Sequence, residues 1–212
     1  MAATRRCAVI GGAPIKDYAR MREALREDDF CVYCDCGLRH RDGLGKAPDL
    51  IVGDFDSFAA PPSGVPTITL PREKDDTDTV FAVKEALRRG FDAFLLLGAA
   101  GGRLDHTLAN VSLLVMLDRL GKQAVLLDDC SDMRIVSREE ALVEENCRFF
   151  SLLAVNGPAR HVTIENAKFP LHDAQIRCDY QYGVSNEVLP GKTARVRVGE
   201  GQLLLMRIFH EA

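Results

Sequence analysis

The feature that most constrains the fold is a regular alternation of short apolar runs and helix-like segments in the first 130 residues. The apolar runs lie at residues 6–10, 30–33, 50–52, 67–70, 94–97 and 124–127, and several end at a glycine or a proline. Segments with helical periodicity lie between them, at residues 15–27, 77–89 and 104–120. Continuous apolar strands separated by helices are typical of a parallel sheet covered on both faces. We therefore predict a Rossmann-like, three-layer α/β domain.

The periodicity of the two longer helical segments also predicts which side chains they bury. Gly90 and Gly121 follow these segments, as expected at the carboxyl end of a helix. The expected buried faces are Val80, Val83 and Leu87 in the first, and Leu104, Leu108, Val111 and Val115 in the second.

The pattern changes after about residue 129. Short strand-like runs at residues 148–155, 161–165, 174–178, 194–198 and 203–208 are separated by breaks such as Asn-Gly-Pro and Pro-Gly-Lys, and no convincing amphipathic helix is present. This spacing favours a separate, smaller all-β sandwich. We predict an α/β domain at residues 1–130 and a β-sandwich at residues 131–212, joined through a polar segment between residues 128 and 145.

Charge and hydropathy exclude several classes of protein. Twenty-seven Lys and Arg against 31 Asp and Glu give a net charge of −4, which argues against nucleic-acid binding. No apolar run approaches the roughly 20 residues that span a bilayer. The first six residues lead into only a short apolar run, unlike a secretory signal, so we expect a cytoplasmic protein with no membrane partner.

The seven cysteines are an odd number in a chain without secretory features, which favours free thiols over a disulfide framework. Cys31, Cys34 and Cys36 lie close together and so suggest a zinc or iron–sulfur site. The fourth ligand of such a site is missing from the pattern, however. The favoured interpretation is a buried strand in which cysteine acts as a small apolar residue.

Two acidic groups dominate the chemistry. Asp54 and Asp56 directly follow the apolar run at 50–52, and Asp75 and Asp78 lie where the segment 77–89 begins. Asp75 or Thr77 can cap that helix, but a cap explains only one or two of the acids. Converging carboxylates raise one another's pKa unless a cation neutralises them. Oxygen ligands without histidine or thiol favour Mg²⁺, which commonly bridges protein and substrate phosphates.

A third group, residues 98–103, is a glycine-rich turn between a strand and a helix. Gly101 and Gly102 allow a phosphate to approach the backbone closely, and Arg103 adds a charged donor. The turn lacks the P-loop and dinucleotide-binding patterns. Asp105, which can cap the following helix, and His106 are polar groups at the start of an otherwise apolar segment. Together with the acidic groups, the turn indicates phosphate chemistry.

Four motifs in order resemble those of the thiamine pyrophosphokinase family. They are Gly-Asp-Phe-Asp-Ser at 53–57, Lys-Asp-x-Thr-Asp at 74–78, Gly-Gly-Arg-x-Asp-His at 101–106 followed by Asn110, and Gly-Val-Ser-Asn-Glu at 183–187. The resemblance covers essentially the whole chain. It implies transfer of a diphosphoryl group from ATP to the hydroxyl of thiamine, giving thiamine diphosphate and AMP. It also implies a homodimer with thiamine bound between the α/β domain of one chain and the sandwich of the other.

The resemblance further implies roles for individual residues. Asp54, Asp56, Asp75 and Asp78 would hold Mg²⁺ or arrange the triphosphate, and Ser185 and Asn186 would face thiamine. The residues expected at the nucleotide and the reacting phosphates are Asp35, Gly37, Lys74, Gly101, Gly102, Arg103, Asp105, His106 and Asn110. The general base stays open between Asp75, Asp78 and Asp105, and proton loss late in a loose transition state with little help from a base is a further alternative.

One departure and two alternatives accompany this resemblance. The family usually has Asp-Gly-Gly after its second strand, whereas this chain has Asp35-Cys36-Gly37, with a side chain where bare backbone is usual. Asp54 and Asp56 after a strand also resemble the nucleophile and acid of a haloacid-dehalogenase-like phosphatase, which forms an aspartyl-phosphate. A non-catalytic nucleotide or thiamine sensor is the alternative from another class.

Overall fold

The computed structural model of the chain describes residues 4–55, 64–73 and 75–210. Its contacts divide it into two compact units, Met1–Asp129 and Cys130–Ala212. The join expected from the sequence was after residue 130. In the part of the chain described, no helix is long and apolar enough to cross a membrane.

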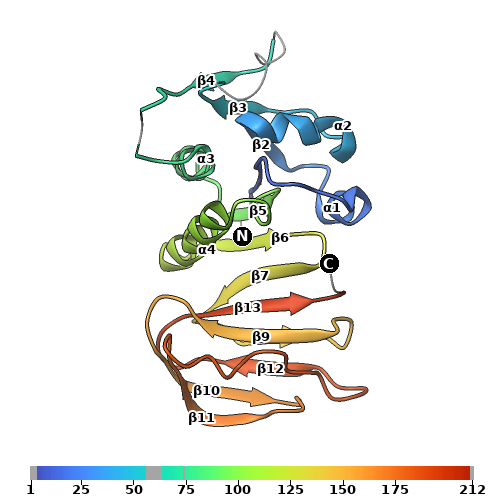
Figure 1. Ribbon diagram of the computed structural model, residues 1–212, viewed down its shortest axis with the longest axis vertical. Coiled ribbons are helices and arrows are strands. Elements are labelled where there is room, and N and C mark those ends of the chain that lie inside the picture. The colour runs from blue at the N-terminus through green and yellow to red at the C-terminus, as the bar shows by residue number, and fades with distance from the viewer. Residues whose placement is uncertain (1–3, 56–63, 74, 211–212) are drawn as a thin grey trace. The chain divides into compact units, whose positions relative to one another are not determined.

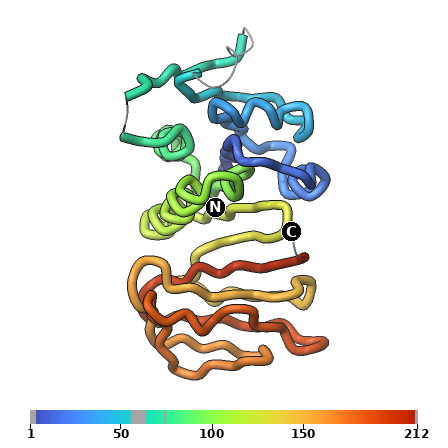
Figure 2. The backbone as a smooth tube through the Cα atoms, in the orientation of Figure 1, coloured from blue at the N-terminus to red at the C-terminus, as the bar shows by residue number. Residues whose placement is uncertain are grey.

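The first unit is built on a parallel sheet. Its strands lie in the order β4-β3-β2-β1-β5-β6, and each neighbouring pair is parallel. The strands are β1 (Arg6–Ile10), β2 (Phe30–Cys34), β3 (Leu50–Gly53), β4 (Thr67–Thr69), β5 (Ala93–Leu97) and β6 (Gln123–Leu127). Figure 2 follows the chain from β1 outward to β4 and back to β5 on the other side of β1. The strand order therefore reverses between β1 and β5, and such a switch point opens a crevice at the carboxyl ends of the strands.

Helices cover both faces of this sheet, so the predicted three-layer α/β architecture is confirmed. They are α1 (Tyr18–Ala24), the 3₁₀ helix η1 (Asp35–His40), α2 (Arg41–Leu44), α3 (Asp78–Arg88) and α4 (Leu104–Arg119). Helices α1 and α2 lie on one side, and α3 and α4 on the other (Figure 1). Alternate strand residues such as Ala8 and Ile10 pack with Met21 of α1 and Leu44 of α2 in one apolar core.

The buried faces of the two longer helices differ from those predicted. Helix α3 buries Val83 as expected, but the rest of its buried apolar face is Ala82 and Ala86. In α4 the prediction was wrong at the first two turns, where Leu104 is 70% and Leu108 59% exposed. The buried apolar residues of α4 are instead Leu113, Leu114, Val115 and Leu117. Apolar periodicity alone does not show which turns of a helix are covered.

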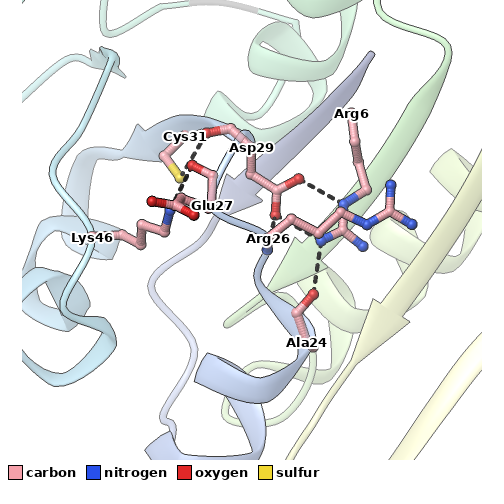
Figure 3. Close-up of polar contacts among 7 residues, drawn as sticks. All are labelled: Arg6, Ala24, Arg26, Glu27, Asp29, Cys31 and Lys46. Atoms are coloured by element: carbon pink, nitrogen blue, oxygen red, sulfur yellow. Dashed lines mark hydrogen bonds and ion pairs between the residues drawn. The ribbon is translucent and has the colours of Figure 1, made fainter. Parts of the chain in front are cut away.

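A buried ion pair lies at the amino end of β2. The Asp29 carboxylate, whose side chain is fully buried, accepts hydrogen bonds from Nε and Nη2 of Arg6, each at 2.7 Å (Figure 3). The backbone N–H of Arg26 also donates to Asp29 at 2.7 Å, and Arg6 Nη2 donates to the carbonyl of Ala24 at 2.7 Å. Both oxygens of this buried acid are therefore satisfied.

The second unit is a sandwich of two antiparallel sheets, as the sequence predicted. One sheet has the order β7-β13-β9 and the other β11-β10-β12-β8. A single apolar core contains residues from both sheets, including Phe150, Val162 and Leu205. The strands are β7 (Ser131–Val136), β8 (Ala141–Val143), β9 (Phe149–Ala154), β10 (Ala159–Glu165), β11 (Leu171–Ile176), β12 (Ala194–Arg197) and β13 (Leu203–Ile208).

Strands β7 and β8 lie where the sequence predicted a polar connection. Strand β7 was not predicted because it contains Asp132. A charged residue in a buried strand needs a partner from elsewhere in the fold, which the local sequence does not show. That partner is Arg207 on β13, whose Nε donates to Asp132 at 3.0 Å. The pairing of β7 with β13 places the two residues opposite each other.

Candidate active site

A cleft of about 540 Å³ opens in the first unit at the carboxyl ends of the strands. Its walls come from the segments that follow β1, β2, β3 and β5 and from the first turns of α3 and α4, so it lies at the switch point of the sheet. The residues that line it are Gly11, Gly12, Ala13, Pro14, Cys34, Asp35, Cys36, Arg39, Asp54, Thr77, Asp78, Thr79, Gly98, Ala99, Gly101, Gly102, Arg103, His106 and Asn110.

Bare backbone forms the wall of the cleft between β1 and β5. A Cβ atom at Gly11 would lie 2.6 Å from the carbonyl oxygen of Gly98, and one at Gly98 would lie 2.5 Å from the carbonyl oxygen of Gly11. Gly98 also has a φ of +55°, which favours glycine. Hydrogen bonds from Gly11 N to Leu97 O and from Ala13 N to Gly98 O, both 2.8 Å, hold the two segments together. Neither position can therefore carry a side chain, and main chain lines the cleft here.

Three carboxylates converge in this cleft. Asp35 begins η1 directly after β2, Asp54 follows β3, and Asp78 is the first residue of α3. Each contributes a carboxylate oxygen to a group whose atoms all lie within 4.8 Å of one another. Parallel strands bring their carboxyl ends to one edge, which is why residues distant in sequence meet here.

Asp35 is the most buried of the three, with 8% of its surface exposed. Its Oδ1 atom is buried and has no hydrogen-bond partner among the described residues, whereas its Oδ2 accepts from Cys36 Sγ at 3.3 Å. Asp35 also has a φ of +31°, a conformation that side chains rarely adopt. A Cβ atom at Gly53 would lie 2.9 Å from Cβ of Asp35, so β3 leaves the space that Asp35 occupies.

The structure changes the expected set of acids. Asp54 and Asp78 lie together as predicted, and Asp35, which was expected to contact the nucleotide, joins them. Asp75 is exposed and is not among the residues that line the cleft. Asp56 and Lys74 lie outside the described residues. The signal for Asp35 was its place directly after the apolar run at 30–33, which matches the place of Asp54 after β3.

Helix α3 begins as one of the two capping interpretations predicted. Thr77 is its N-cap, and its Oγ1 accepts a hydrogen bond from Val80 N at 3.2 Å. This cap sets Asp78 in the first turn of the helix, facing the other two acids.

The glycine-rich turn before α4 is held by a different residue than expected. Arg103 is the N-cap of α4 and makes no side-chain capping bond, so the predicted capping role of Asp105 is wrong. Thr107 Oγ1 accepts from Gly101 N at 3.1 Å and donates to Arg103 O at 3.2 Å, which closes the turn. Asp105 instead pairs with the Arg103 guanidinium at the surface, where that partner lowers the pKa of Asp105 to about 2.

Asn110 and Gly37 support the walls of the cleft. Asn110 is buried, and its Nδ2 donates to the carbonyl of Ala99 at 2.7 Å, which ties α4 to the segment after β5. Gly37 does not line the cleft, because it packs beneath it: a Cβ atom there would lie 2.2 Å from Ile10 O. Its predicted contact with a nucleotide has no direct counterpart in this geometry.

Several lining residues were missed from the sequence. Ala13 and Pro14 follow the first glycine pair, Arg39 lies on η1, and Thr79 lies on α3. Arg39 Nε donates to Cys36 O at 2.9 Å, and its charge stands at the rim of a cleft that contains three carboxylates. The η1 helix itself was not predicted, since residues 35–40 have neither strand nor clear helical periodicity.

The three clustered cysteines are free thiols, and no disulfide involves them. Cys31 and Cys34 are buried in β2, as the favoured interpretation predicted. Burial raises the pKa of Cys31 to about 11, with Asp49 and Asp29 adding to the effect. Burial, followed by the hydrogen bond to Asp35, also raises the pKa of Cys36, the member of the group that is partly exposed in the cleft.

The motif at 183–187 lies in the second unit, between β11 and β12. Asn186 is buried, and its side chain binds the backbone: Oδ1 accepts from Phe169 N at 3.0 Å and Glu187 N at 2.9 Å, while Nδ2 donates to Phe169 O at 2.8 Å. Ser185 is exposed, has a φ of +57°, and its N–H donates to Ser151 Oγ at 3.0 Å. Asn186 thus fixes the loop, while Ser185 presents its hydroxyl at the surface.

Two family models match the chain in succession. The model described as "Thiamin pyrophosphokinase, catalytic domain" matches residues 21–126, within the first unit. The model described as "Thiamin pyrophosphokinase, vitamin B1 binding domain" matches residues 134–203, within the second. The chain belongs to the thiamin pyrophosphokinase family.

Individual relatives agree with this family. The chain is 27% identical over 211 residues to the thiamine pyrophosphokinase of Bacillus subtilis, covering 94% of this chain and 96% of that protein. The crystal structure of the Bacillus subtilis enzyme has a TM-score of 0.85 at 24% identity, covering 98% of this chain and all of that one. Thiamin pyrophosphokinase from Candida albicans has a TM-score of 0.73 at 15% identity, covering 97% and 89%. The fold of the thiamin pyrophosphokinase family therefore extends over nearly the whole chain.

Proposed function

We propose that this protein transfers a diphosphoryl group from ATP to the hydroxyl of thiamine, with thiamine diphosphate and AMP as products. The observation that carries the proposal is the meeting of three carboxylates beside a glycine-walled cleft, in a chain that matches both family models. The glycine wall suits a triphosphate, and the acids suit the cation that accompanies it. The same matches favour this reaction over the phosphatase alternative.

The acidic group fits Mg²⁺ on its donor chemistry. All three ligand groups are carboxylates, and three such charges within 4.8 Å repel one another in a partly buried site. The buried Oδ1 of Asp35 is a ready ligand atom. We infer that Asp35, Asp54 and Asp78 hold Mg²⁺, which when bound would neutralise charge on the phosphates and hold them for in-line attack.

The chain's own residues would position the triphosphate. The backbone at Gly11–Gly12 and Gly98–Gly102 allows close approach, and the amino end of α4 directs its positive dipole toward an anion. Arg103 and Arg39 place positive charge at the rim. These features favour a geometry in which the thiamine hydroxyl attacks the β-phosphorus in line with the leaving AMP oxygen.

Asp105 is a poor candidate for the general base. A carboxylate whose pKa is lowered to about 2 by Arg103 takes a proton from a hydroxyl poorly, and Asp105 does not line the cleft. We assign it to orienting Arg103.

The second unit would supply the thiamine side of the reaction. We propose that Ser185 contacts thiamine and that Asn186 acts by holding the loop, in a homodimer whose thiamine site lies between chains. The match to the vitamin B1 binding model supports the assignment of this unit. A cytoplasmic location, where ATP and free thiols are maintained, fits the seven free cysteines.

The test incubates the purified protein with ATP, thiamine and Mg²⁺ and separates nucleotides and thiamine esters by chromatography. AMP and thiamine diphosphate should form in equal amounts, and neither should form when EDTA is added. Formation of ADP with thiamine monophosphate would replace the proposal with a monophosphoryl transfer. ATP binding without turnover would support the sensor alternative, and release of phosphate from phosphomonoesters without thiamine would support the phosphatase.

A further inference from the structure

The two oxygens of the Asp35 carboxylate have different surroundings. Oδ2 accepts a hydrogen bond from Sγ of the neighbouring Cys36 at 3.3 Å. Oδ1 is buried and has no hydrogen-bond partner among the described residues. The carboxylate as a whole belongs to the group formed with Asp54 and Asp78. One side of a single acid is therefore bound within the protein, and the other is left for something else.

The backbone around Asp35 and Cys36 is closely packed. Asp35 has a φ of +31°. It occupies space that Gly53 leaves open, since a Cβ atom at Gly53 would lie 2.9 Å from Cβ of Asp35. Cys36 has a similar neighbour: a Cβ atom at Gly12 would lie 2.6 Å from Cβ of Cys36. These contacts fix the main chain and both Cβ atoms, but rotation of the Asp35 carboxylate about its side-chain bonds remains. Among the described residues, the Cys36 thiol donates to this carboxylate. That hydrogen bond can select one orientation of the Asp35 side chain.

We propose that Cys36 is a positioning residue for the cation of the active site. Its thiol donates to Oδ2 of Asp35 and leaves Oδ1 as the oxygen without a hydrogen-bond partner among the described residues, so that a cation held with Asp54 and Asp78 would take Oδ1 as its ligand. Groups that hydrogen-bond to a metal ligand orient it and tune its affinity. This inference rests on the proposed function, because it assumes that the acidic group holds a divalent cation.

The geometry separates this role from direct ligation by sulfur. The group of ligand atoms within 4.8 Å of one another contains the three carboxylates and, among the described residues, no cysteine sulfur. Cys34, the other thiol at the cleft, is fully buried and hydrogen-bonds to Thr79. Cys36 therefore acts on the cation through Asp35.

The experiment measures binding of Mn²⁺, as a paramagnetic substitute for Mg²⁺, to the full-length protein in the presence of α,β-methylene-ATP. The electron paramagnetic resonance signal of free Mn²⁺, corrected by the same titration of Mn²⁺ and nucleotide without protein, gives the dissociation constant without any turnover. Cys36→Ala should weaken binding by about three- to tenfold, less than the roughly 10–100-fold typical for the partner of a metal ligand, because a thiol is a weak donor. Cys36→Ser, which keeps a donor, should restore binding to within about twofold of the wild type. Cys178→Ala, an exposed thiol of the second unit, is the matched control and should change nothing.

Two outcomes would overturn the inference. One is unchanged Mn²⁺ affinity in the folded Cys36→Ala protein, and the other is a Cys36→Ser protein as weak as Cys36→Ala. If Cys36→Ala does not fold, Cys36→Gly also removes the donor and carries the same expectation. Product formation from ATP and thiamine is measured separately. A wild type that binds Mn²⁺ but makes no thiamine diphosphate would remove the proposed reaction and leave the role of Cys36 standing.

Discussion

The two ends of β2 carry one buried aspartate each, and the difference between them separates structure from chemistry. Asp29, before the strand, has both oxygens paired by Arg6 and a further bond from Arg26 N (Figure 3). Asp35, after the strand, has one oxygen held by Cys36 and the other without a partner among the described residues. The protein alone satisfies the acid at the amino end of the strand, whereas the proposed cation would satisfy the acid at the carboxyl end.

This contrast shows how the same residue type serves two purposes in one sheet. A buried charge that has its partners is tolerated by the fold, and its removal leaves the partner charge unpaired in the interior. Carboxylates that lie close together repel one another, which opposes folding and is typical of sites that bind a cation. Substitutions in the acidic group at the carboxyl end of β2 should therefore lower activity. Substitutions in the ion pair at its amino end should lower stability.

The largest effect is expected from Asp78→Asn, in the group of carboxylates to which Asp35 at the carboxyl end of β2 belongs. The change removes one charge from the three-carboxylate group while keeping its size, so turnover should fall by about two to four orders of magnitude if the cation supplies several kcal/mol to the reaction. Initial rates of thiamine diphosphate formation at saturating ATP check it. The control is Asp76→Asn, which removes an acid two residues away that pairs with Lys84 at the surface. Equal activity of the two variants would remove Asp78 from the site.

Next comes Asp29→Ala at the amino end. It leaves Arg6 buried without its partner, so the free energy of unfolding should fall by about 3–5 kcal/mol, as for other buried pairs that lose one member. Urea denaturation followed by circular dichroism measures it. Asp28→Ala, which removes the neighbouring exposed acid, is the matched control and should change stability little.

Urea denaturation of Asp35→Asn tests the carboxyl end of β2 in the same way. Removing a charge from the cluster relieves repulsion, so stability should stay the same or rise while Mn²⁺ binding weakens. A large loss of stability in Asp35→Asn would mean that the two ends of β2 do not differ in the way proposed.

The fold and part of the acidic group were accessible from the sequence, whereas the contrast between the two ends of β2 was not. Apolar runs separated by helical segments predicted the parallel sheet, and Asp54 and Asp78 were singled out because helix capping explains only one or two of the four acids in the two groups. The place of Asp35 in the cluster was not predicted, because it depends on a 3₁₀ helix and on a positive φ that no periodicity encodes. The same holds for Asn186, whose motif suggested a ligand contact but whose amide holds the backbone of a loop.

An effect of intermediate size is expected in the second unit, at the loop that contains Ser185 and Asn186. Asn186→Ala removes three hydrogen bonds to buried or partly buried backbone groups, so the free energy of unfolding should fall by about 1–3 kcal/mol. The KM for thiamine should rise more than the KM for ATP, because the loop belongs to the thiamine side. Ser185→Ala is the companion variant and should raise the KM for thiamine without a loss of stability. Equal changes in both KM values would contradict the assignment of this loop.

The smallest effect expected is a pH dependence of opposite sign in the two units. His40 is buried in the first unit, where Nε2 lies 2.9 Å from Ala13 O and Nδ1 lies 2.8 Å from Tyr18 Oη. A carbonyl only accepts, so Nε2 carries the proton, and in the neutral ring Nδ1 accepts from the tyrosine hydroxyl. Burial lowers the pKa of His40, and Arg39 adds to this, against the opposing effects of Ala13 O and Asp129. The folded state therefore binds fewer protons than the unfolded state, and His40 costs stability as pH falls below 6.5.

His161 in the second unit has the reverse behaviour. Its hydrogen bond to Asp173, followed by the charge of that residue, raises the pKa of the exposed imidazole. Its contribution to stability is present below pH 6.5 and is lost as pH rises through the folded-state pKa. Urea denaturation from pH 5 to pH 8 separates the two. His40→Gln should flatten the loss of stability on acidification, and His161→Gln should steepen it, while His172→Gln removes an exposed histidine as the control. A His40→Gln protein that loses stability on acidification as steeply as the wild type would show that the cleft wall at Ala13 does not depend on a neutral His40.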